Sequence, residues 1–431
     1  MGTTAFRGAR LLLPVALCLL TASPVLAEPH PLSLPQAIEI ALNNNPDLAS
    51  LRKEEGVLDA STLRAGLLPN PTLELEGETG ALTGSSAEHT LSLGVSQEFL
   101  TGDKRHKRRV VAEREIAAYR WQLADRGRAL KEQVQEGYYD VLLAQERLGL
   151  VNHAITLNRQ LLQVAEDRLA AGDIPELEMY LVKVELTRSE GTLIEMERAL
   201  QESRSKLFSL LALAPGASPA LNGRLDSGAP LTLGVADLKE LAFRNRPDLK
   251  ALHATLSKSD AEVALAEADA IPNLTAALAL SREAGSMEIG GIEGRETSYL
   301  VGVKFSMPIP VFDKNQAGLQ EARVKRSSAE IRVKGAASNV EREVETAYAS
   351  LANADKVLSL YKSNIMRQLE ENLALTQEAY RLGEVGILAV IQEQKKFFEV
   401  SDSYLTALHA RQLAWTKLES AIAADINGGA Q

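Results

Sequence analysis

Apolar residues recur at two different spacings along this chain, and each spacing predicts its own kind of element. In the second half, a repeated spacing of four and then three residues joins eight positions: Val340, Val344, Ala347, Leu351, Ala354, Leu358, Tyr361 and Ile365. A shift of 210 positions reaches a matching set in the first half, interrupted only by a glycine: Leu130, Val134, Gly137, Val141, Ala144, Leu148, Val151 and Ile155. This heptad spacing predicts long helices that pack along a coiled-coil seam.

The matched spacing predicts that the chain contains two tandem copies of one structural unit. Short motifs return in the same order: Asn45-Pro46-Asp47-Leu48 is echoed by Arg246-Pro247-Asp248-Leu249, and Pro69-Asn70 is echoed by Pro272-Asn273. We expect a first repeat at 28–213, a linker rich in Gly, Pro and Ser at 214–230, a second repeat at 231–425 and a tail at 426–431.

Each repeat is predicted to contain three helices. The first has about 35 residues and covers Ser33–Leu68 or Val235–Ala270. The second, at Lys104–Leu169 or Lys314–Leu382, has about 65 residues or more and would be roughly 100 Å long. A glycine-containing turn ends it, since glycine tolerates a helix C-terminus best, and a third helix of about 35 residues returns.

Strict alternation of apolar and polar residues marks four shorter segments. The apolar members are Leu73 and Leu75 within Thr72–Gly80; Leu91, Leu93 and Val95 within Thr90–Phe99; Leu274, Ala276, Leu278 and Leu280; and Tyr299, Val301, Val303, Phe305 and Met307. Segments of about ten residues with this period are typical of outer-membrane strands. Flexible polar loops are expected between the members of each pair, at Gly77–Ser86 and Gly285–Gly294.

Two interpretations of these strands stay open. Soluble hairpins on a helical bundle would need a partner layer over their apolar face, and every other segment predicts long helix. Lipid contact is therefore favoured. Four strands cannot close a barrel around a channel, and long helices with one apolar seam need neighbours. The predicted fold is mainly α with a small β part: duplicated helical hairpins that form an α-barrel, plus four membrane strands per chain, completed in an oligomer.

The first 27 residues have the layout of a secretory signal peptide. Arg7 and Arg10 precede the apolar stretch Leu11–Leu20, and Val25-Leu26-Ala27 resembles a cleavage site. Cys18, the one cysteine, follows Leu17 rather than a small residue, which disfavours a lipoprotein without removing that alternative.

Charge and composition exclude several classes of function. The net charge is −10, and removing the leader, which holds two arginines and no acidic residue, takes it to −12. This balance disfavours nucleic acid as a partner. A single cysteine excludes a disulfide scaffold and a cysteine zinc site. The six histidines lack metal-ligand spacing, there is no phosphate-binding glycine motif, and no enzyme, cofactor or resident metal is expected.

In its tandem halves, paired strands and glycine turns, the chain resembles the outer-membrane efflux protein family, the TolC-like channels. The most specific stretches are Leu67-Leu68-Pro69-Asn70-Pro71, Gly102-Asp103-Lys104-Arg105 and residues 308–318. The last two are most similar to the heavy-metal branch, the CzcC/CusC-like proteins.

This resemblance implies a homotrimer with a twelve-stranded barrel in the outer membrane and a hollow helical cylinder in the periplasm. It also implies a passive exit duct whose helix tips dock onto a periplasmic adaptor, the membrane fusion protein, coupled to an inner-membrane pump of the resistance-nodulation-division (RND) type. The tip residues carried over are Gly172, Asp173, Ile174 and Pro175 in the first repeat, and Gly383, Glu384, Val385 and Gly386 in the second.

Some family members carry acidic residues just past the tip glycine, where they narrow the entrance. Glu176 and Glu178 follow the first tip here, but Ala389 and Gln392 stand at comparable positions after the second. Three copies of Glu178 would form a cation-attracting ring, and a solvated helix start is the alternative. In the strands, Glu74, Glu76 and Glu78 are expected to face the lumen.

Further alternatives remain. The basic run Lys104-Arg105-His106-Lys107-Arg108-Arg109 indicates contact with lipid headgroups or pairing between chains rather than nucleic-acid binding. A multidrug or type I secretion duct of the same fold would have the same general pattern. A periplasmic coiled-coil adaptor or scaffold is the rival of a different class, although it would more naturally have one hairpin between compact β domains.

Overall fold

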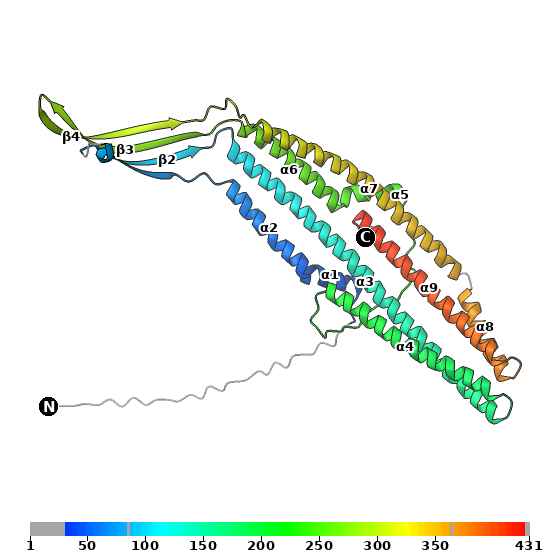
Figure 1. Ribbon diagram of the computed structural model, residues 1–431. Coiled ribbons are helices and arrows are strands. Elements are labelled where there is room, and N and C mark those ends of the chain that lie inside the picture. Colours follow the sequence, from blue (N-terminus) through cyan, green and yellow to red (C-terminus); the bar gives the residue numbers. More distant parts are fainter. Residues whose placement is uncertain (1–30, 84–86, 363–364, 427–431) are drawn as a thin grey trace, which may run out of the picture.

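The computed structural model describes residues 31–83, 87–362 and 365–426. The expected signal peptide with Cys18 lies outside the described residues, as does the tail beyond residue 426. The chain forms one long, slender body with a four-stranded sheet at one end and two helix-to-helix turns at the other (Figure 1). Helices that run side by side occupy the length between these ends.

The sheet contains the four predicted strands. They are β1 (Thr72–Thr79), β2 (His89–Phe99), β3 (Leu274–Ile289) and β4 (Ile292–Ser306), antiparallel in the order β1-β2-β3-β4. The sequence alternation indicated two hairpins but not how they combine. In the structure β2 pairs with β3 from His89↔Ala284 to Phe99↔Leu274, so the two halves of the chain share one sheet.

The two loops predicted within the hairpins are shorter than expected. β1 continues to Thr79 and is followed by a 3-10 turn at Gly80–Thr83. β3 and β4 extend to a two-residue turn at Gly290-Gly291, where φ is +66° and +82°. Two adjacent residues with positive φ make the tight hairpin turn that matches strand twist. Backbone pairing therefore continues through segments whose polar side chains had suggested loops.

The strand register separates apolar from polar side chains. Two cross-strand rows on one face are Leu75↔Leu93↔Leu280↔Val301 and Leu73↔Val95↔Leu278↔Val303. Successive side chains alternate between faces, so the row Glu76↔Ser92↔Ser281↔Leu300, polar except for Leu300, lies on the other face. The apolar face stays open: Leu75 and Val301 are each 73% exposed.

Proline breaks both of the predicted first helices. The structure has α1 (Leu34–Asn44) and α2 (Pro46–Ala65) in the first half, and α5 (Val235–Asn245) and α6 (Pro247–Asp269) in the second. Proline lacks an N–H and disfavours helical backbone in the residue before it, but it suits the first position of a new helix. Asn45 and Arg246 accordingly have ψ of 122° and 120°.

The remaining helices form the long body. They are α3 (Lys104–Ala170), α4 (Glu176–Leu210), α7 (Gln316–Lys362), α8 (Ile365–Arg381) and α9 (Ile387–Ile422). With 67 residues, α3 is about 100 Å long. Among the described residues, no helix combines the length and apolar character that a membrane-spanning helix requires.

Most of the heptad positions lie in the helical core, although Ile365 is exposed. Leu130, Val134 and Val141 belong to one buried cluster, and Val344 and Leu351 belong to another. Gly137, the position that interrupts the apolar pattern, lies against α4: a Cβ there would be 3.6 Å from Leu207 Cδ1. The seam is therefore tightly packed at this residue without a side chain.

The segment between the halves is tied to the helices. Leu32 pairs with Leu221 through a short parallel bridge, and the Tyr138 hydroxyl of α3 contacts the carbonyl oxygens of Leu32 and Asn222. Arg411 of α9, 2% exposed, bonds Asp355 at 3.0 Å and the carbonyl oxygen of Ala229. The linker thus lies packed on α3 and α9.

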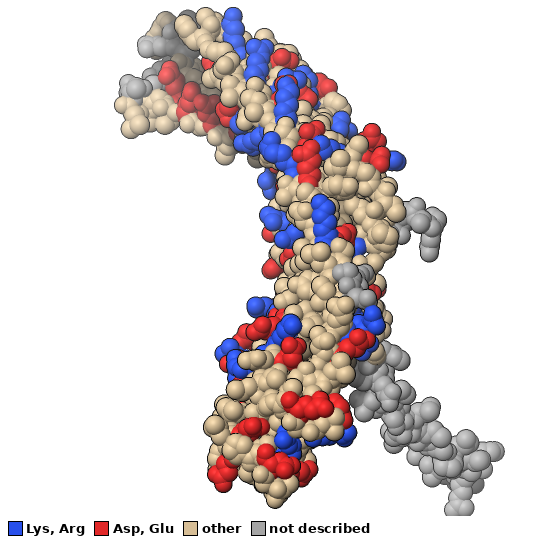
Figure 2. Space-filling view, turned by 90° about the vertical axis from the view of Figure 1, so that its right-hand side faces the viewer, with Lys and Arg blue, Asp and Glu red and all other residues tan. Residues whose placement is uncertain are grey.

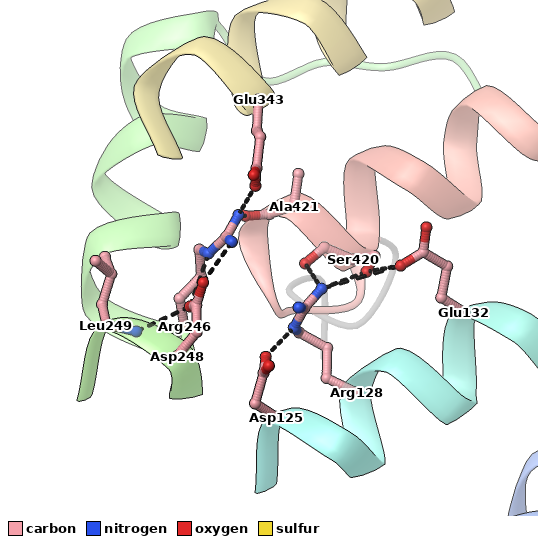
Figure 3. A network of polar contacts seen from close by, with 9 residues as sticks. All are labelled: Asp125, Arg128, Glu132, Arg246, Asp248, Leu249, Glu343, Ser420 and Ala421. Atoms are coloured by element: carbon pink, nitrogen blue, oxygen red, sulfur yellow. Dashed lines mark hydrogen bonds and ion pairs between the residues drawn. The ribbon is translucent and has the colours of Figure 1, made fainter. Parts of the chain in front are cut away.

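A buried arginine joins three helices of the second half (Figure 3). Arg246, 4% exposed, forms a two-pronged pair with Asp248, with Nε–Oδ1 at 3.0 Å and Nη2–Oδ2 at 2.6 Å. Its Nη1 donates to Glu343 of α7 at 2.5 Å and to the carbonyl oxygen of Ala421 of α9 at 3.1 Å. The planar guanidinium group holds its N–H donors in a fixed arrangement that suits paired hydrogen bonds to a carboxylate.

A second arginine ties the two halves together beside the first (Figure 3). Arg128 of α3 bonds Asp125 at 2.8 Å through Nε and donates through Nη1 to Ser420 Oγ of α9 at 2.6 Å. Ser420 Oγ in turn donates to Glu132 Oε2 at 2.5 Å. Charged groups therefore connect α3, α6, α7 and α9 at one level of the body.

The environment of Asp248 makes this network pH-dependent. Burial disfavours the charged carboxylate, but the hydrogen bonds and positive charge of Arg246 outweigh burial and hold the pKa of Asp248 below its ordinary value. A depressed carboxyl pKa stabilises the fold above the unfolded-state pKa of about 4. That contribution is lost as the pH falls through the lower pKa of the folded state.

We expect Asp248→Asn to lower the free energy of unfolding at pH 7 by about 1–3 kcal/mol, because Arg246 would keep its burial and lose a charged partner. The difference from the wild type should shrink at pH 3. Thermal unfolding of the detergent-solubilised protein at both pH values measures it. Asp47→Asn is the matched control, because Asp47 holds the corresponding position in the first half and is exposed. Equal losses in both variants would contradict the role given to the Arg246 pair.

Candidate functional site

The first helix tip is a tight turn between α3 and α4. Gly172 has φ of +80°, and the backbone N–H groups of Gly172 and Asp173 donate to the carbonyl oxygens of Leu169 and Arg168 at 3.0 and 2.9 Å. These two bonds form the Schellman arrangement that ends many helices. Asp173 and Pro175 are exposed, whereas Ile174 is buried.

The second tip, between α8 and α9, repeats this geometry. Gly383 has φ of +82°, and the N–H groups of Gly383 and Glu384 donate to Tyr380 and Ala379 at 3.0 and 2.8 Å. Glu384 and Gly386 are exposed and Val385 is half-buried. Each predicted tip glycine thus occupies the left-handed conformation that glycine adopts most readily.

The two tips lie together at the same end of the molecule (Figure 1). Ile174 packs in one apolar cluster with Tyr380 and Ile387. Arg168 of α3 crosses between the hairpins: it donates to the Tyr380 carbonyl oxygen at 2.8 Å, and its guanidinium carbon lies 4.9 Å from the centre of the Tyr380 ring. A cation above an aromatic face is attracted to it.

The candidate entrance residues differ in their surroundings. Glu176 and Gln392 are exposed, but Glu178 is half-buried, and its Oε2 is shielded from solvent without a hydrogen-bond partner among the described residues. Burial, together with the negative charge of Glu178, raises the pKa of the Tyr380 hydroxyl above its ordinary value. The Glu178 carboxylate therefore lies beside Tyr380, within the packing of the two tips.

At the opposite end, the polar face of the sheet is acidic. Glu74, Glu76 and Glu78 of β1 are all exposed, and Glu74 accepts a hydrogen bond from Ser96 Oγ at 2.9 Å. The strand register brings Glu283 and Lys304 to the same face. Figure 2 shows acidic side chains gathered at this end of the molecule, with lysine and arginine side chains beside them.

The basic run at the start of α3 contains one buried lysine and several exposed arginines. Lys104 is only 4% exposed, and its Nζ bonds the carbonyl oxygen of Ile271 at 2.5 Å and Asn273 Oδ1 at 2.8 Å. It therefore joins the two halves inside the chain, a role that the sequence interpretation missed. Arg105, Arg108 and Arg109 are exposed and leave a basic surface where the sheet meets the helices.

Sequence reasoning also missed Arg168, Tyr380 and the Arg246 network. One signal was available: Arg246 replaces Asn45 in the repeated motif ahead of proline. Asn45 caps α2 by accepting from the N–H groups of Asp47 and Leu48, both at 3.1 Å. Arg246 occupies the same backbone position but reaches across to α7 and α9. Within the described residues, no cluster of three or more His, Cys, Asp or Glu side chains is arranged to hold a metal ion.

Comparison with known proteins agrees with this architecture. A sequence profile described as Outer membrane efflux protein matches residues 37–213 and 238–424. These segments make up most of the chain. The chain belongs to the outer membrane efflux protein family.

Relatives in this outer membrane efflux family match over nearly their full length. The cobalt-zinc-cadmium resistance protein CzcC of Cupriavidus metallidurans is 26% identical over 390 residues, which cover 90% of this chain and 89% of CzcC. The cation efflux system protein CusC of Escherichia coli is 24% identical over 396 residues, 89% of this chain and 85% of CusC.

Solved structures share the fold. A crystal structure of CusC superimposes with a TM-score of 0.73 at 19% identity and covers 91% of this chain and 92% of that one. The Campylobacter jejuni CmeC outer membrane channel has a TM-score of 0.72 at 13% identity, with coverage of 92% and 88%. The predicted family is confirmed, as is the fold of one chain, mainly α with a small four-stranded sheet, and this member is an outer-membrane efflux channel protein.

We expect Gly383→Arg to abolish efflux while the protein still reaches the outer membrane. A non-glycine residue with positive φ costs about 1–2 kcal/mol, and a Cβ at this position would already lie 3.4 Å from Arg168 Nη2. The measurement is growth of a complemented deletion strain on compounds that the deletion strain no longer tolerates. Gly383→Asn is the matched control, because asparagine accepts this conformation better. Full resistance with Gly383→Arg would contradict the proposed importance of the turn.

Proposed function

We propose that this protein is the passive outer-membrane exit duct of a tripartite system that exports heavy-metal cations. The observation that carries the proposal is the division of the sheet into an exposed apolar face and an acidic polar face with Glu74, Glu76 and Glu78. The relatives CzcC and CusC, which are named for cobalt-zinc-cadmium resistance and for cation efflux, support the choice of cargo.

The working unit is a homotrimer in this proposal. β1 and β4 are the edge strands of the sheet, so each has one side free to pair with another copy. Three copies would join four strands each into a closed twelve-stranded barrel, which leaves no free edge. In the body, Leu177, Tyr180 and Val184 form an exposed apolar stripe on α4 at helical spacing, as expected of a helix that packs on a neighbouring chain.

The apolar face would contact outer-membrane lipid, and the acidic face would line the water-filled lumen. The exposed basic residues at the start of α3 would then lie at the level of the headgroups on the periplasmic side, with the helical body extending into the periplasm. In this scheme the two halves, 28–213 and 231–425, are tandem repeats, and each contributes an equivalent helical hairpin to the wall of the cylinder.

The two tips are the proposed docking surface for a periplasmic adaptor that connects the duct to an RND-type pump. The two turns lie together at the end opposite to the sheet (Figure 1), and Asp173, Glu384 and Gly386 are exposed on them. Glu176 is exposed there and is the better candidate for an acidic entrance ring, because Glu178 is half-buried and its Oε2 is shielded from solvent. The chain itself would perform no catalysis.

One finding favours a different cargo. The chain is also 23% identical over 406 residues to the pyoverdine export outer membrane protein OpmQ of Pseudomonas aeruginosa, whose name concerns an organic molecule. A multidrug or secretion duct would keep the same fold and conduit role. A soluble periplasmic scaffold is the alternative of another class, and membrane fractionation separates it from a channel: heat-stable oligomers in the outer-membrane fraction favour the duct.

The orientation of the sheet leads to a paired prediction. Leu93→Arg should impair assembly into the outer membrane, because an arginine at the lipid-facing midplane costs roughly 2–4 kcal/mol. Ser92→Arg, one residue away and on the polar face, should be milder. Heat-resistant oligomers in outer-membrane fractions are the measurement. Equal defects at the two positions would remove the basis for the lipid-facing assignment.

The acidic face predicts cation selectivity. In planar bilayers, the reversal potential under a salt gradient should indicate preference for cations, and replacing Glu74, Glu76 and Glu78 together with Gln should lower the cation-to-anion permeability ratio by about two-fold or more. The effect should weaken at high salt, where charges are screened. An anion-selective wild-type channel would refute the lumen assignment.

The same proposal predicts the phenotype of a deletion strain. Loss of the gene should sensitise cells to zinc, cobalt, cadmium, copper or silver salts more than to organic drugs. Sensitivity to drugs with unchanged metal tolerance would assign the protein to a multidrug system instead. Because cargo selection is expected in the pump, the purified channel should not bind these metals tightly.

A further inference from the structure

The two edge strands of the sheet carry opposite charges on its polar face. β1 presents Glu74, Glu76 and Glu78 there, and all three are exposed. β4 presents Lys304 on the same face, also exposed, and the residue opposite it on β3 is Ala277. The pairing inside the chain therefore places no carboxylate opposite this lysine. A carboxylate can be placed there only by a strand that pairs with the free edge of β4.

The internal repeat indicates which residue of a second copy would lie opposite Lys304. Thr72 lies opposite Ser96 in the first hairpin, and Thr275 lies opposite Ser306 in the second. β1 thus corresponds to β3 at an offset of 203 positions (72 to 275), which is also the offset of the repeated Pro-Asn motif. β2 corresponds to β4 at an offset of 210 positions (96 to 306), which is also the offset of the heptad positions.

The pairing of β2 with β3 is the contact that a second copy can repeat. In this pair Gly94 lies opposite Ala279. A Cβ at Gly94 would be 3.5 Å from the Ala279 Cβ, so side chains at these two positions point toward each other at short range. The offsets convert Gly94 into Lys304, and they convert Ala279 into Glu76.

We propose that β4 of one copy pairs with β1 of the next copy in the register that places Lys304 opposite Glu76. This register rests on the trimer of the proposed function and specifies the contact between its subunits. The adjacent pair is Phe305 with Leu75, which are 69% and 73% exposed in the single chain and lie on the apolar face. Opposite charges and apolar side chains that face each other across antiparallel strands stabilise their pairing.

The same register gives a strand tilt that suits a closed barrel. Inside one chain, a row of paired residues runs Thr72↔Ser96↔Ala277↔Lys304. It then reaches Glu76 of the next copy, so the row advances by about four residues per chain, or about twelve in three copies. With about 3.3 Å per residue along a strand and about 4.8 Å between strands, twelve strands with this stagger tilt by about 35°. Strands of membrane barrels tilt by about 35–45°.

Pairs of introduced cysteines test the register in outer-membrane fractions that contain the full-length protein. Cys18, the one native cysteine, lies in the expected leader. Glu76→Cys with Lys304→Cys should give covalent trimers on oxidation, because residues directly opposite each other satisfy disulfide geometry. Boiled samples on denaturing gels without reductant measure the linked fraction. A link within one chain is excluded, since two strands separate β1 from β4 and hold them about 14 Å apart.

Glu74→Cys and Glu78→Cys, each combined with Lys304→Cys, are the matched controls. They lie on the same face, two residues to either side of Glu76. Diagonal neighbours are about 7–8 Å apart, which is too far for a disulfide without backbone movement. We expect each control to link about five-fold less than the Glu76 pair.

Exchange of charges tests the contact without a covalent bond. Glu76→Lys or Lys304→Glu alone would place like charges opposite each other and should lower the temperature at which trimers dissociate by several degrees. The variant with both changes should dissociate near the wild-type temperature, whereas Glu78→Lys with Lys304→Glu should not recover. Failure of the double exchange at Glu76 and Lys304 to restore trimer stability would overturn the contact.

The outcomes distinguish this register from the proposed duct. Heat-stable trimers that link best through position 74 or 78, equally through all three positions, or through none of them would overturn the register and leave the trimeric duct in place. Protein that remains monomeric in the outer membrane would overturn both the register and the trimer.

Discussion

The hydrogen-bonded pairing of β2 with β3 is the contact on which the architecture depends. It is the point where the two halves of the chain become one sheet, and its register sets which side chains share a face. Because alternation has a period of two, a slip of one residue along this pair would move Leu93 and Val95 to the acidic side. The same pairing brings the start of α3 against the end of α6, where Lys104 bonds the backbone of Ile271 and the side chain of Asn273.

Away from the sheet, charged groups join the helices, both between the halves and within the second half. Arg128 connects α3 to α9, and Arg246 connects α6 to α7 and α9, both at one level of the body. Such groups are directional and need defined partners, which makes them suited to fixing the relative position of helices whose apolar seams would tolerate sliding. At the tips, Arg168 performs a similar task, with a carbonyl oxygen and an aromatic face as its partners.

The surfaces that remain open correspond to the functions proposed for them. In the proposed duct, the apolar face of the sheet would meet lipid, its edge strands would pair with further copies of the chain, and the tips would meet an adaptor. Large exposed apolar patches commonly mark sites of contact with proteins or membranes, and here they gather in separate places. The acidic strand face differs from these, because in the proposed duct its exposed carboxylates would act through their field on passing ions.

The sequence by itself determined the elements and the family. Heptad spacing predicted α3 and a single helix at Lys314–Leu382, which the structure gives as α7 and α8. Alternation predicted the strands, and the tip glycines at positions 172 and 383 were identified from the turns that they make. Each of these features depends on local periodicity or local backbone conformation. The helix breaks at Asn45 and Arg246 also have a local cause, because a proline follows each of these residues. Ending each predicted helix before its proline would have located both breaks. Only the tertiary structure decided that β2 pairs with β3, that Lys104 is buried, that Arg246 reaches Glu343, and that Glu178 lies beside Tyr380. These contacts join residues far apart in the chain, and no local pattern encodes which distant partner a side chain will meet.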